Sequence, residues 1–258
     1  MTDFGADSTL VGRVVPSPNH GIRKGAACPD MIVMHYTGLA ETEMALEMFW
    51  SAKSELSAHY VILEDGLIVQ CVAEARRAWH AGVSAWAGAT DINSCSIGIE
   101  IANPGHELGY VDFTDAQIEA VIALCSDIIA RHRIQPCRVL AHSDVAPSRK
   151  RDPGEKFPWG RLYERGVGHW VDPIPVTEIG AEIRPGDHGA AVSAMQASLA
   201  AYGYGIAKSG IYDASTEYVV TAFQRHFRPA RVDGIADAST IKTLDGLLAG
   251  LPRSLSEY

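Results

Sequence analysis

The sequence predicts an α/β (α+β) protein with a central mixed β-sheet flanked by helices, plus a small C-terminal three-helix domain. Three observations predict this fold class: short β-rich runs in the first 140 residues, a long amphipathic helical pattern among them, and a change of texture near residue 173. The chain has 258 residues, of which 47% are apolar and 21% charged, so it can bury a substantial core.

Five short runs rich in β-branched residues predict the strands of the sheet. They are residues 31–35, 59–64, 67–72, 96–101 and 139–142. The second and third runs flank Asp65-Gly66, a dipeptide typical of hairpins, because glycine readily adopts the positive φ of a tight turn. We therefore expect these two strands to be antiparallel neighbours.

Two stretches have the apolar spacing of helices. The shorter one is residues 41–51. The longer one runs from Asp115 to about Arg133, with Thr114 as a natural N-cap and Gln117 completing a capping box. Its apolar residues predict one stripe that faces the sheet: Ile118, Val121, Ile122, Cys125, Ile128 and Ile129.

The C-terminal part has a different organisation. An exposed connection is expected near residues 173–185, which divides the chain into domains at 1–175 and 186–250. Residues 210–216 recur as residues 234–240, and each copy offers Asp and Ser/Thr as helix caps. Two apolar stripes complete the pattern of a three-helix unit: Val192, Met195, Leu199 and Tyr202, then Val220, Phe223 and Phe227.

Charge and composition exclude several classes of partner. The net charge is −9 and no basic cluster appears, so nucleic acid is not expected. The sequence contains no run of 18 apolar residues, so no transmembrane segment is expected. Five scattered cysteines without a CxxC pair, of which Cys71 and Cys125 lie in apolar stretches, are typical of free thiols in a reducing compartment. Since the N-terminus lacks a signal pattern, we expect a cytoplasmic location, with the periplasm or cell envelope as the alternative if a signal was removed.

Two histidines and an aspartate stand where a sheet would expose them. His35 ends the first β-rich run, His142 ends the fifth, and Asp152 follows ten residues later. Two imidazoles and one carboxylate suit Zn²⁺ with one open position. The spacing alone is weak, because a chain with ten histidines often contains it and a single histidine is more often a packed or surface residue.

Two further charged residues could belong to the same site. Glu100 lies between isoleucines in a β-rich run, so it must find a partner or accept a raised pKa, which suits a general base. Alternatively, it faces solvent on a half-buried strand. Lys150 lies two residues before Asp152 and could point toward the metal, or it is one cation of a solvated Arg-Lys-Arg loop.

Three segments together are far more specific than these spacings: VMHYT, AWHAGVSAWAGATDINSCSIGIEIAN and AHSDVAPSRKRDPGEKFPW. Over roughly residues 28–165 the chain resembles the N-acetylmuramoyl-L-alanine amidases of the AmpD/AmiD type. The resemblance implies Zn²⁺ as the cofactor, His35, His142 and Asp152 as its ligands, Glu100 as the catalytic glutamate, and Lys150 as the lysine that stabilises the transition state.

The resemblance also implies a substrate groove and a second module. The groove would be lined by the segment that contains Trp79, His80 and Ala81. The C-terminal part resembles the peptidoglycan-binding domain found beside many cell-wall hydrolases, with Phe223-Gln224 and Asp233-Gly234 as its most recognisable residues. Alternatively, that domain only buttresses the amidase.

The implied activity is hydrolysis of the amide bond between N-acetylmuramic acid and L-alanine in peptidoglycan or (anhydro-)muropeptides. A non-catalytic module that recognises peptidoglycan or muropeptides is the alternative, although the complete ligand set argues against it. A zinc peptidase that cuts within the stem peptide is disfavoured, because the HExxH signature is absent. A cytoplasmic enzyme would recycle anhydro-muropeptides, whereas the wall-binding resemblance favours the envelope.

Overall fold

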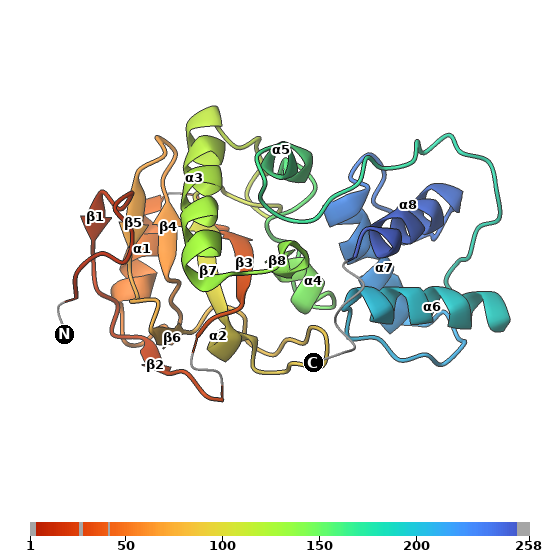
Figure 1. Cartoon of the computed structure of the whole chain (residues 1–258), viewed down its shortest axis with the longest axis horizontal. Helices are drawn as coiled ribbons and strands as arrows, with labels where there is room; N and C mark the ends of the chain where they lie inside the picture. The colour runs from red at the N-terminus through yellow and green to blue at the C-terminus, as the bar shows by residue number, and fades with distance from the viewer. Residues whose placement is uncertain (1–3, 26–27, 41, 252–258) are drawn as a thin grey trace.

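A six-stranded mixed sheet forms the centre of the computed structural model, which describes residues 4–25, 28–40 and 42–251 (Figure 1). The strand order is β1-β5-β4-β7-β3-β8. Strands β4, β7, β3 and β8 are mutually parallel, while β5 is antiparallel to β4. The strands are β1 (Arg13–Val14), β3 (Met31–Tyr36), β4 (Tyr60–Ile62), β5 (Ile68–Gln70), β7 (Ser96–Ile101) and β8 (Val139–Ala141). A separate antiparallel pair joins β2 (His20–Ile22) to β6 (Arg76–Ala78).

The predicted strands are found, with shifts at their ends. Strand β7 has the predicted bounds, β3 is one residue longer than predicted, and β4 and β5 are shorter. The predicted hairpin between β4 and β5 is confirmed, and Gly66 has φ +84°. The prediction that His142 ends a strand is wrong, since His142 is the first residue of a short helix, α4. The chain turns there because the Asp144 carboxylate accepts a hydrogen bond from the backbone N–H of Ala141.

The helices surround this sheet and form the C-terminal unit. They are α1 (Thr42–Trp50), α2 (Ile92–Cys95), α3 (Asp115–His132), α4 (His142–Val145), α5 (Trp159–Glu164), α6 (Ala190–Tyr202), α7 (Ala214–Phe227) and α8 (Ala238–Ala249), with a 3₁₀ turn at Pro136–Arg138. The capping box of α3 is confirmed, because Thr114 and Gln117 exchange hydrogen bonds. Of the shorter predicted helix, Glu41 lies outside the described residues and Ser51 lies beyond the end of α1.

The two faces of the sheet have different covers. Alternate residues of β3 point to opposite sides, as the two-residue period of a strand requires. Ile32 and Met34 pack with the apolar stripe of α3, which lies across one face in Figure 1. Met31 and Val33 pack instead into a cluster with residues of α6, α7 and α8. The C-terminal helices therefore complete the core on one side of the sheet.

The C-terminal unit contains the three predicted helices. Asp213 and Asp237, at equivalent positions of the repeat, cap α7 and α8 by accepting from Thr216 N (2.9 Å) and Thr240 N (2.7 Å). The domain limits 1–175 and 186–250 stay a prediction, because the shared core does not itself mark a boundary. Cys71 and Cys125 are buried and unpaired. Within the described ranges, no helix is both long and apolar enough to span a bilayer.

Candidate metal and catalytic site

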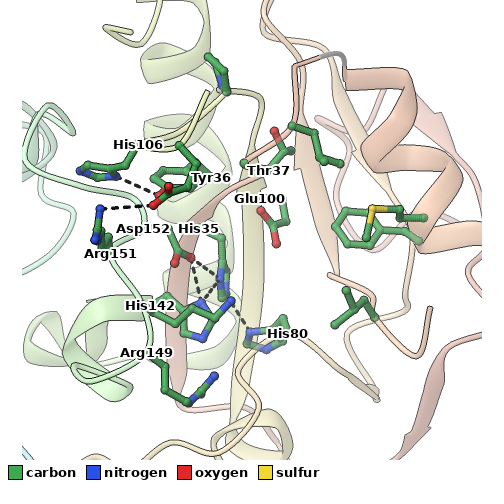
Figure 2. A pocket seen from close by; sticks show the side chains of 18 of the residues that line it. His35, Tyr36, Thr37, His80, Glu100, His106, His142, Arg149, Arg151 and Asp152 are labelled. Atoms are coloured by element: carbon green, nitrogen blue, oxygen red, sulfur yellow. Dashed lines mark hydrogen bonds and ion pairs between the residues drawn. The ribbon is translucent and has the colours of Figure 1, made fainter. Parts of the chain in front are cut away.

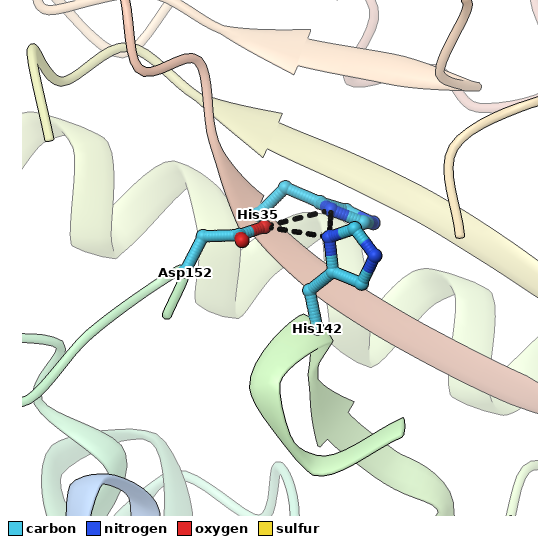
Figure 3. A group of neighbouring side chains, drawn as sticks. All are labelled: His35, His142 and Asp152. Carbon is cyan, nitrogen blue, oxygen red and sulfur yellow. Dashed lines mark hydrogen bonds and ion pairs between the residues drawn. The ribbon is translucent and has the colours of Figure 1, made fainter. Parts of the chain in front are cut away.

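His35, His142 and Asp152 converge at one point (Figure 3). The two Nδ1 atoms lie 2.9 Å apart, and Asp152 Oδ2 lies 3.0 Å from His35 Nδ1 and 2.9 Å from His142 Nδ1. All three residues are buried. The sequence placed these residues 107 and 10 positions apart, and the fold brings one donor atom of each together.

The topology of the sheet explains this convergence. Strands β3 and β8 are parallel neighbours, so their carboxyl ends meet at the same edge. His35 lies near the end of β3, and His142 follows the last residue of β8. Asp152 is brought back to this edge by a backbone hydrogen bond from Ser143 N to Asp152 O (3.0 Å).

The outward contacts of the two rings leave their inner nitrogens suited to a cation. His142 Nε2 lies 3.1 Å from the carbonyl oxygen of Ala81, which can only accept, so the hydrogen-bond partners assign the proton to Nε2 and the lone pair to Nδ1. His35 Nε2 is likewise occupied outside the cluster, by His80 Nδ1 at 3.0 Å. Imidazole and carboxylate donors that face one another in this way fit Zn²⁺.

The protonation states of His35 and Asp152 also favour the binding of a metal ion. Burial and then the neighbouring His142 lower the pKa of His35 to about 4, although the hydrogen bond with Asp152 opposes them. Burial raises the pKa of Asp152, but His142 and then His35 outweigh burial and hold it well below its usual range. A neutral His35 and an ionised Asp152 are the states in which these side chains bind metals.

Glu100 lies beside this cluster on β7. It is the register partner of His35 in the β3–β7 ladder, and it points to the same side of the sheet (Figure 2). Its Oε2 atom is buried, and no group in the described part of the chain hydrogen-bonds to it. Burial raises the pKa of Glu100 well above its usual value; Asp152 adds to this, while Lys150 opposes it. An unpartnered carboxyl with a raised pKa is poised to accept a proton.

A pocket of about 470 Å³ contains these residues, a size typical of ligand sites. The ligand cluster, Glu100 and Lys150 line it together, so Lys150 does not simply face solvent. Trp79 and His80 line it as well. Ala81 does not, because its side chain is fully buried in the core; its carbonyl instead holds His142 and Arg149.

The position of His80 depends on Gly98 of β7. A Cβ atom at Gly98 would lie 2.5 Å from His80 Cγ, so any larger residue would displace the ring. Such a shift would disturb the 3.0 Å contact between His80 Nδ1 and His35 Nε2. The SIGIE segment therefore contributes space for His80 as well as the Glu100 carboxyl.

Several residues that line the pocket were not predicted from the sequence, among them Tyr36, His106, Arg149 and Arg151. The Tyr36 hydroxyl lies 2.9 Å from His106 Nδ1, as Figure 2 shows. Arg149 and Arg151 precede and follow Lys150 in the sequence. Tyr36 carried a signal, because it directly follows His35 in VMHYT. His106 lies in an irregular loop that has no recognisable pattern, so only the fold reveals it.

Comparisons with known proteins agree with this geometry. Residues 25–155 match the family described as N-acetylmuramoyl-L-alanine amidase, and residues 188–244 match the family described as "Putative peptidoglycan binding domain". The N-acetylmuramoyl-L-alanine amidase AmiD of Escherichia coli is 38% identical over 230 residues, which cover 84% of this chain and 82% of AmiD.

Two solved structures have the same overall fold. E. coli AmiD in complex with the substrate anhydro-N-acetylmuramic acid-L-Ala-D-gamma-Glu-L-Lys superposes with a TM-score of 0.73 at 34% identity, covering 90% of this chain and 97% of AmiD. AmpDH3 of Pseudomonas aeruginosa in complex with anhydromuramic pentapeptide has a TM-score of 0.70 at 30% identity, covering 96% and 98%. On its sequence and its fold, this chain belongs to the N-acetylmuramoyl-L-alanine amidase family.

Proposed function

We propose that this chain hydrolyses the amide bond between N-acetylmuramic acid and L-alanine in peptidoglycan or in (anhydro-)muropeptides, with Zn²⁺ as its cofactor. The observation that carries the proposal is the convergence of His35, His142 and Asp152 in one pocket with Glu100 and Lys150. When bound, zinc supplies a Lewis acid that lowers the pKa of water and polarises a carbonyl oxygen.

Glu100 is proposed as the general base and then the general acid. Its free Oε2 accepts a proton from the attacking water as the oxygen bonds to the amide carbon. As the carbon–nitrogen bond breaks, the same carboxyl returns the proton to the amine of L-alanine. The raised pKa of Glu100 supports both roles, because it brings the pKa of the carboxyl closer to neutral pH.

Lys150 is proposed to stabilise the negative charge that develops on the carbonyl oxygen. Its position in the lining of the same pocket supports this role. An ammonium group aimed at such an oxyanion contributes to the rate in the way that backbone donors do in other hydrolases. Trp79 and His80 are proposed to bound the groove for the substrate. Ala81, although it belongs to the same segment, is proposed to act through its carbonyl, which orients His142.

A product assay tests the reaction. The zinc-loaded chain of residues 1–258 is incubated with a soluble anhydro-muropeptide, and the products are identified by mass spectrometry. We expect anhydro-N-acetylmuramic acid and the intact stem peptide. Cleavage within the stem would instead identify a peptidase. Binding without any product would leave only a recognition module, even though the relatives named above are amidases.

The match of residues 188–244 to a peptidoglycan-binding family supports the proposal that the C-terminal helices contact the wall. The natural substrate and the compartment depend on this contact. Comparing the rate on intact sacculi with the rate on soluble anhydro-muropeptide tests it: a preference for sacculi indicates an envelope enzyme. A preference for the soluble fragment supports the predicted cytoplasmic location.

A further inference from the structure

The C-terminal helices contact the metal-ligand segment through a buried carboxylate. Asp144 lies in α4, two residues after His142, and is completely buried. Its Oδ1 accepts from the hydroxyl of Tyr204 (2.7 Å), and its Oδ2 lies 2.6 Å from Nδ1 of His226. Tyr204 follows the end of α6 and His226 lies in α7, so both of these groups come from the C-terminal unit.

The same carboxylate fixes the start of α4. Besides its two C-terminal partners, Asp144 Oδ2 accepts from the backbone N–H of Ala141 (2.8 Å). Ala141 directly precedes His142, so this bond sets the turn from which the His142 ring projects. A buried carboxylate is stable only when several donors satisfy it. Without Tyr204 and His226, Asp144 would keep only the Ala141 N–H as a donor among the described residues, and this single bond would hold the carboxylate and the turn less firmly.

Aromatic rings pack closely around Asp144 and its two partners. The ring of His226 stacks on Trp159, with centroids 3.8 Å apart. Tyr204 packs edge-on against Trp86, with centroids 4.8 Å apart. Both tryptophans belong to the N-terminal part of the chain and are buried. Aromatic packing of this kind restricts the rotamers of the two donors, so their hydrogen bonds hold Asp144 in one place.

A second contact reaches the segment of another ligand. Arg225, next to His226 on α7, has its Nε 3.7 Å from Oε2 of Glu155, three residues after Asp152. The same Glu155 oxygen lies 3.1 Å from His106 Nε2, and His106 contacts Tyr36 in the pocket lining. Consecutive residues of α7 thus contact the segments that follow His142 and Asp152.

We propose that Tyr204 and His226 are positioning residues for the metal site, because they orient His142 through Asp144. The C-terminal helices would then support the amidase site directly, in addition to any contact with the wall. This inference rests on the metal ligands of the proposed function. It implies that the metal affinity of the site depends on hydrogen bonds made by a unit that contributes none of the proposed ligands.

Two phenylalanine variants of the whole 258-residue chain test the proposal. Tyr204→Phe removes the hydroxyl that contacts Asp144 and keeps the ring. Tyr212→Phe is the matched control, because Tyr212 is equally buried in the C-terminal unit and its hydroxyl donates to the backbone oxygen of Gly234, away from the metal site. The measurements are the zinc dissociation constant, by competition with a chromogenic chelator, and hydrogen exchange of the backbone amides of residues 141–145 without metal.

We expect both variants to lower the melting temperature, Tyr204→Phe at least as much as the control, because its hydroxyl donates to a buried carboxylate. Only Tyr204→Phe should raise the zinc dissociation constant, by about tenfold as is typical for groups that orient metal ligands, and only it should speed exchange in residues 141–145. Equal zinc affinities and equal exchange in the two variants would overturn the inference. If the wild type bound no zinc, the proposed ligand set would fail, and the exchange measurement would still decide whether Tyr204 positions α4.

A second pair separates the hydrogen bond of His226 from its volume. His226→Asn keeps an N–H donor near the position of Nδ1, whereas His226→Leu has a similar shape and no donor. Both lose the stacking on Trp159, so a purely structural role predicts equal zinc affinities. We expect zinc to bind more tightly to the asparagine variant, and equal affinities would contradict a positioning role.

Discussion

Glu74 and Glu100 are both acidic residues with buried oxygens, and the molecule treats them in opposite ways. Glu74 accepts from the Tyr60 hydroxyl at 2.6 Å and Arg131 Nη2 at 2.8 Å, and it lies 2.7 Å from His132 Nε2. Burial alone would raise its pKa, but the hydrogen bonds from Arg131, His132 and Tyr60 lower it to about 2. Glu100 has a buried oxygen without a partner in the described ranges, and its pKa is raised.

The difference separates a structural carboxylate from a chemical one. Glu74 links β4 to the end of α3 through Tyr60 and Arg131, so its ionised form stabilises the fold. At Oε2, Glu100 has no hydrogen-bond donor among the described residues that would stabilise its charge, and it lines a pocket that also contains three metal-ligand candidates. Buried polar atoms in folded proteins normally have hydrogen-bond partners, and exceptions such as Glu100 Oε2 are typical of functional sites.

The largest expected effect concerns the rate. Glu100→Gln should lower kcat by about 10²–10⁴, because an amide cannot accept the proton that a general base removes. Zinc should stay bound, since Glu100 is not a ligand. Turnover of a muropeptide and the zinc content of the variant are the measurements. Retention of more than about a tenth of the activity, a barrier change of only some 1.4 kcal/mol, would remove Glu100 from the role.

The second expected effect concerns the cation beside Glu100. Lys150→Met should lower kcat by about 10²–10³ through the loss of oxyanion stabilisation. It should also raise the pKa of Glu100, because Lys150 opposes the raising effects of burial and Asp152. The acidic limb of the kcat/KM profile should therefore move to higher pH. A profile with an unmoved limb would show that Lys150 does not act on Glu100.

The third prediction tests the structural side of the comparison. Because the pKa of Glu74 falls from 4.5 to about 2, its charge contributes about 3 kcal/mol to the free energy of unfolding at neutral pH. Glu74→Gln should remove this contribution and leave kcat unchanged at temperatures where the variant is folded. Denaturant titrations at neutral pH measure the loss. A loss of activity without a loss of stability would contradict the structural role of Glu74.

The smallest expected effect concerns how stability changes with pH. Glu74 and Glu100 should change it in opposite directions. The depressed pKa of Glu74 gives stability that is present above about pH 4.5 and is lost as the pH falls toward 2. The raised pKa of Glu100 has the opposite consequence: metal-free protein loses stability as the pH rises above about 4.5. Glu100→Gln should therefore be more stable than wild type at neutral pH without metal, by on the order of 1 kcal/mol. Thermal unfolding with a chelator measures this, and a destabilised variant would contradict the account.

The sequence predicted local structure well and non-local packing poorly. The bounds of β7 and the capping box of α3 were predicted because apolar periodicity and capping residues lie within a few positions of one another. Strands β1, β2 and β6 were not predicted, since two or three residues at a sheet edge have no measurable period. The first residue of α4 was misplaced because the turn depends on Asp144, whose own partners are 60 and 82 residues away.

The proposed site divides in the same way. His35, His142, Asp152, Glu100 and Lys150 were predicted as site residues mainly through the resemblance of their segments to a family, and the fold brings all five into one pocket. His106 and the contacts of α7 could not be identified, because they arise only when distant segments pack together. The packing of β3 against α6, α7 and α8 could not be predicted either. Apolar periodicity shows which face of an element is buried, but it does not show which other element covers that face.

The proposed zinc site of His35, His142 and Asp152 is tested most directly by measuring the zinc content of the protein. Wild type, Glu74→Gln and His142→Ala are stripped with a chelator, reloaded with zinc, freed of excess ion and analysed for elements. We expect about one zinc per chain in the wild type and in Glu74→Gln, and little zinc in His142→Ala, which lacks a ligand. An undiminished zinc content in His142→Ala, or no zinc in the wild type, would contradict the metal site.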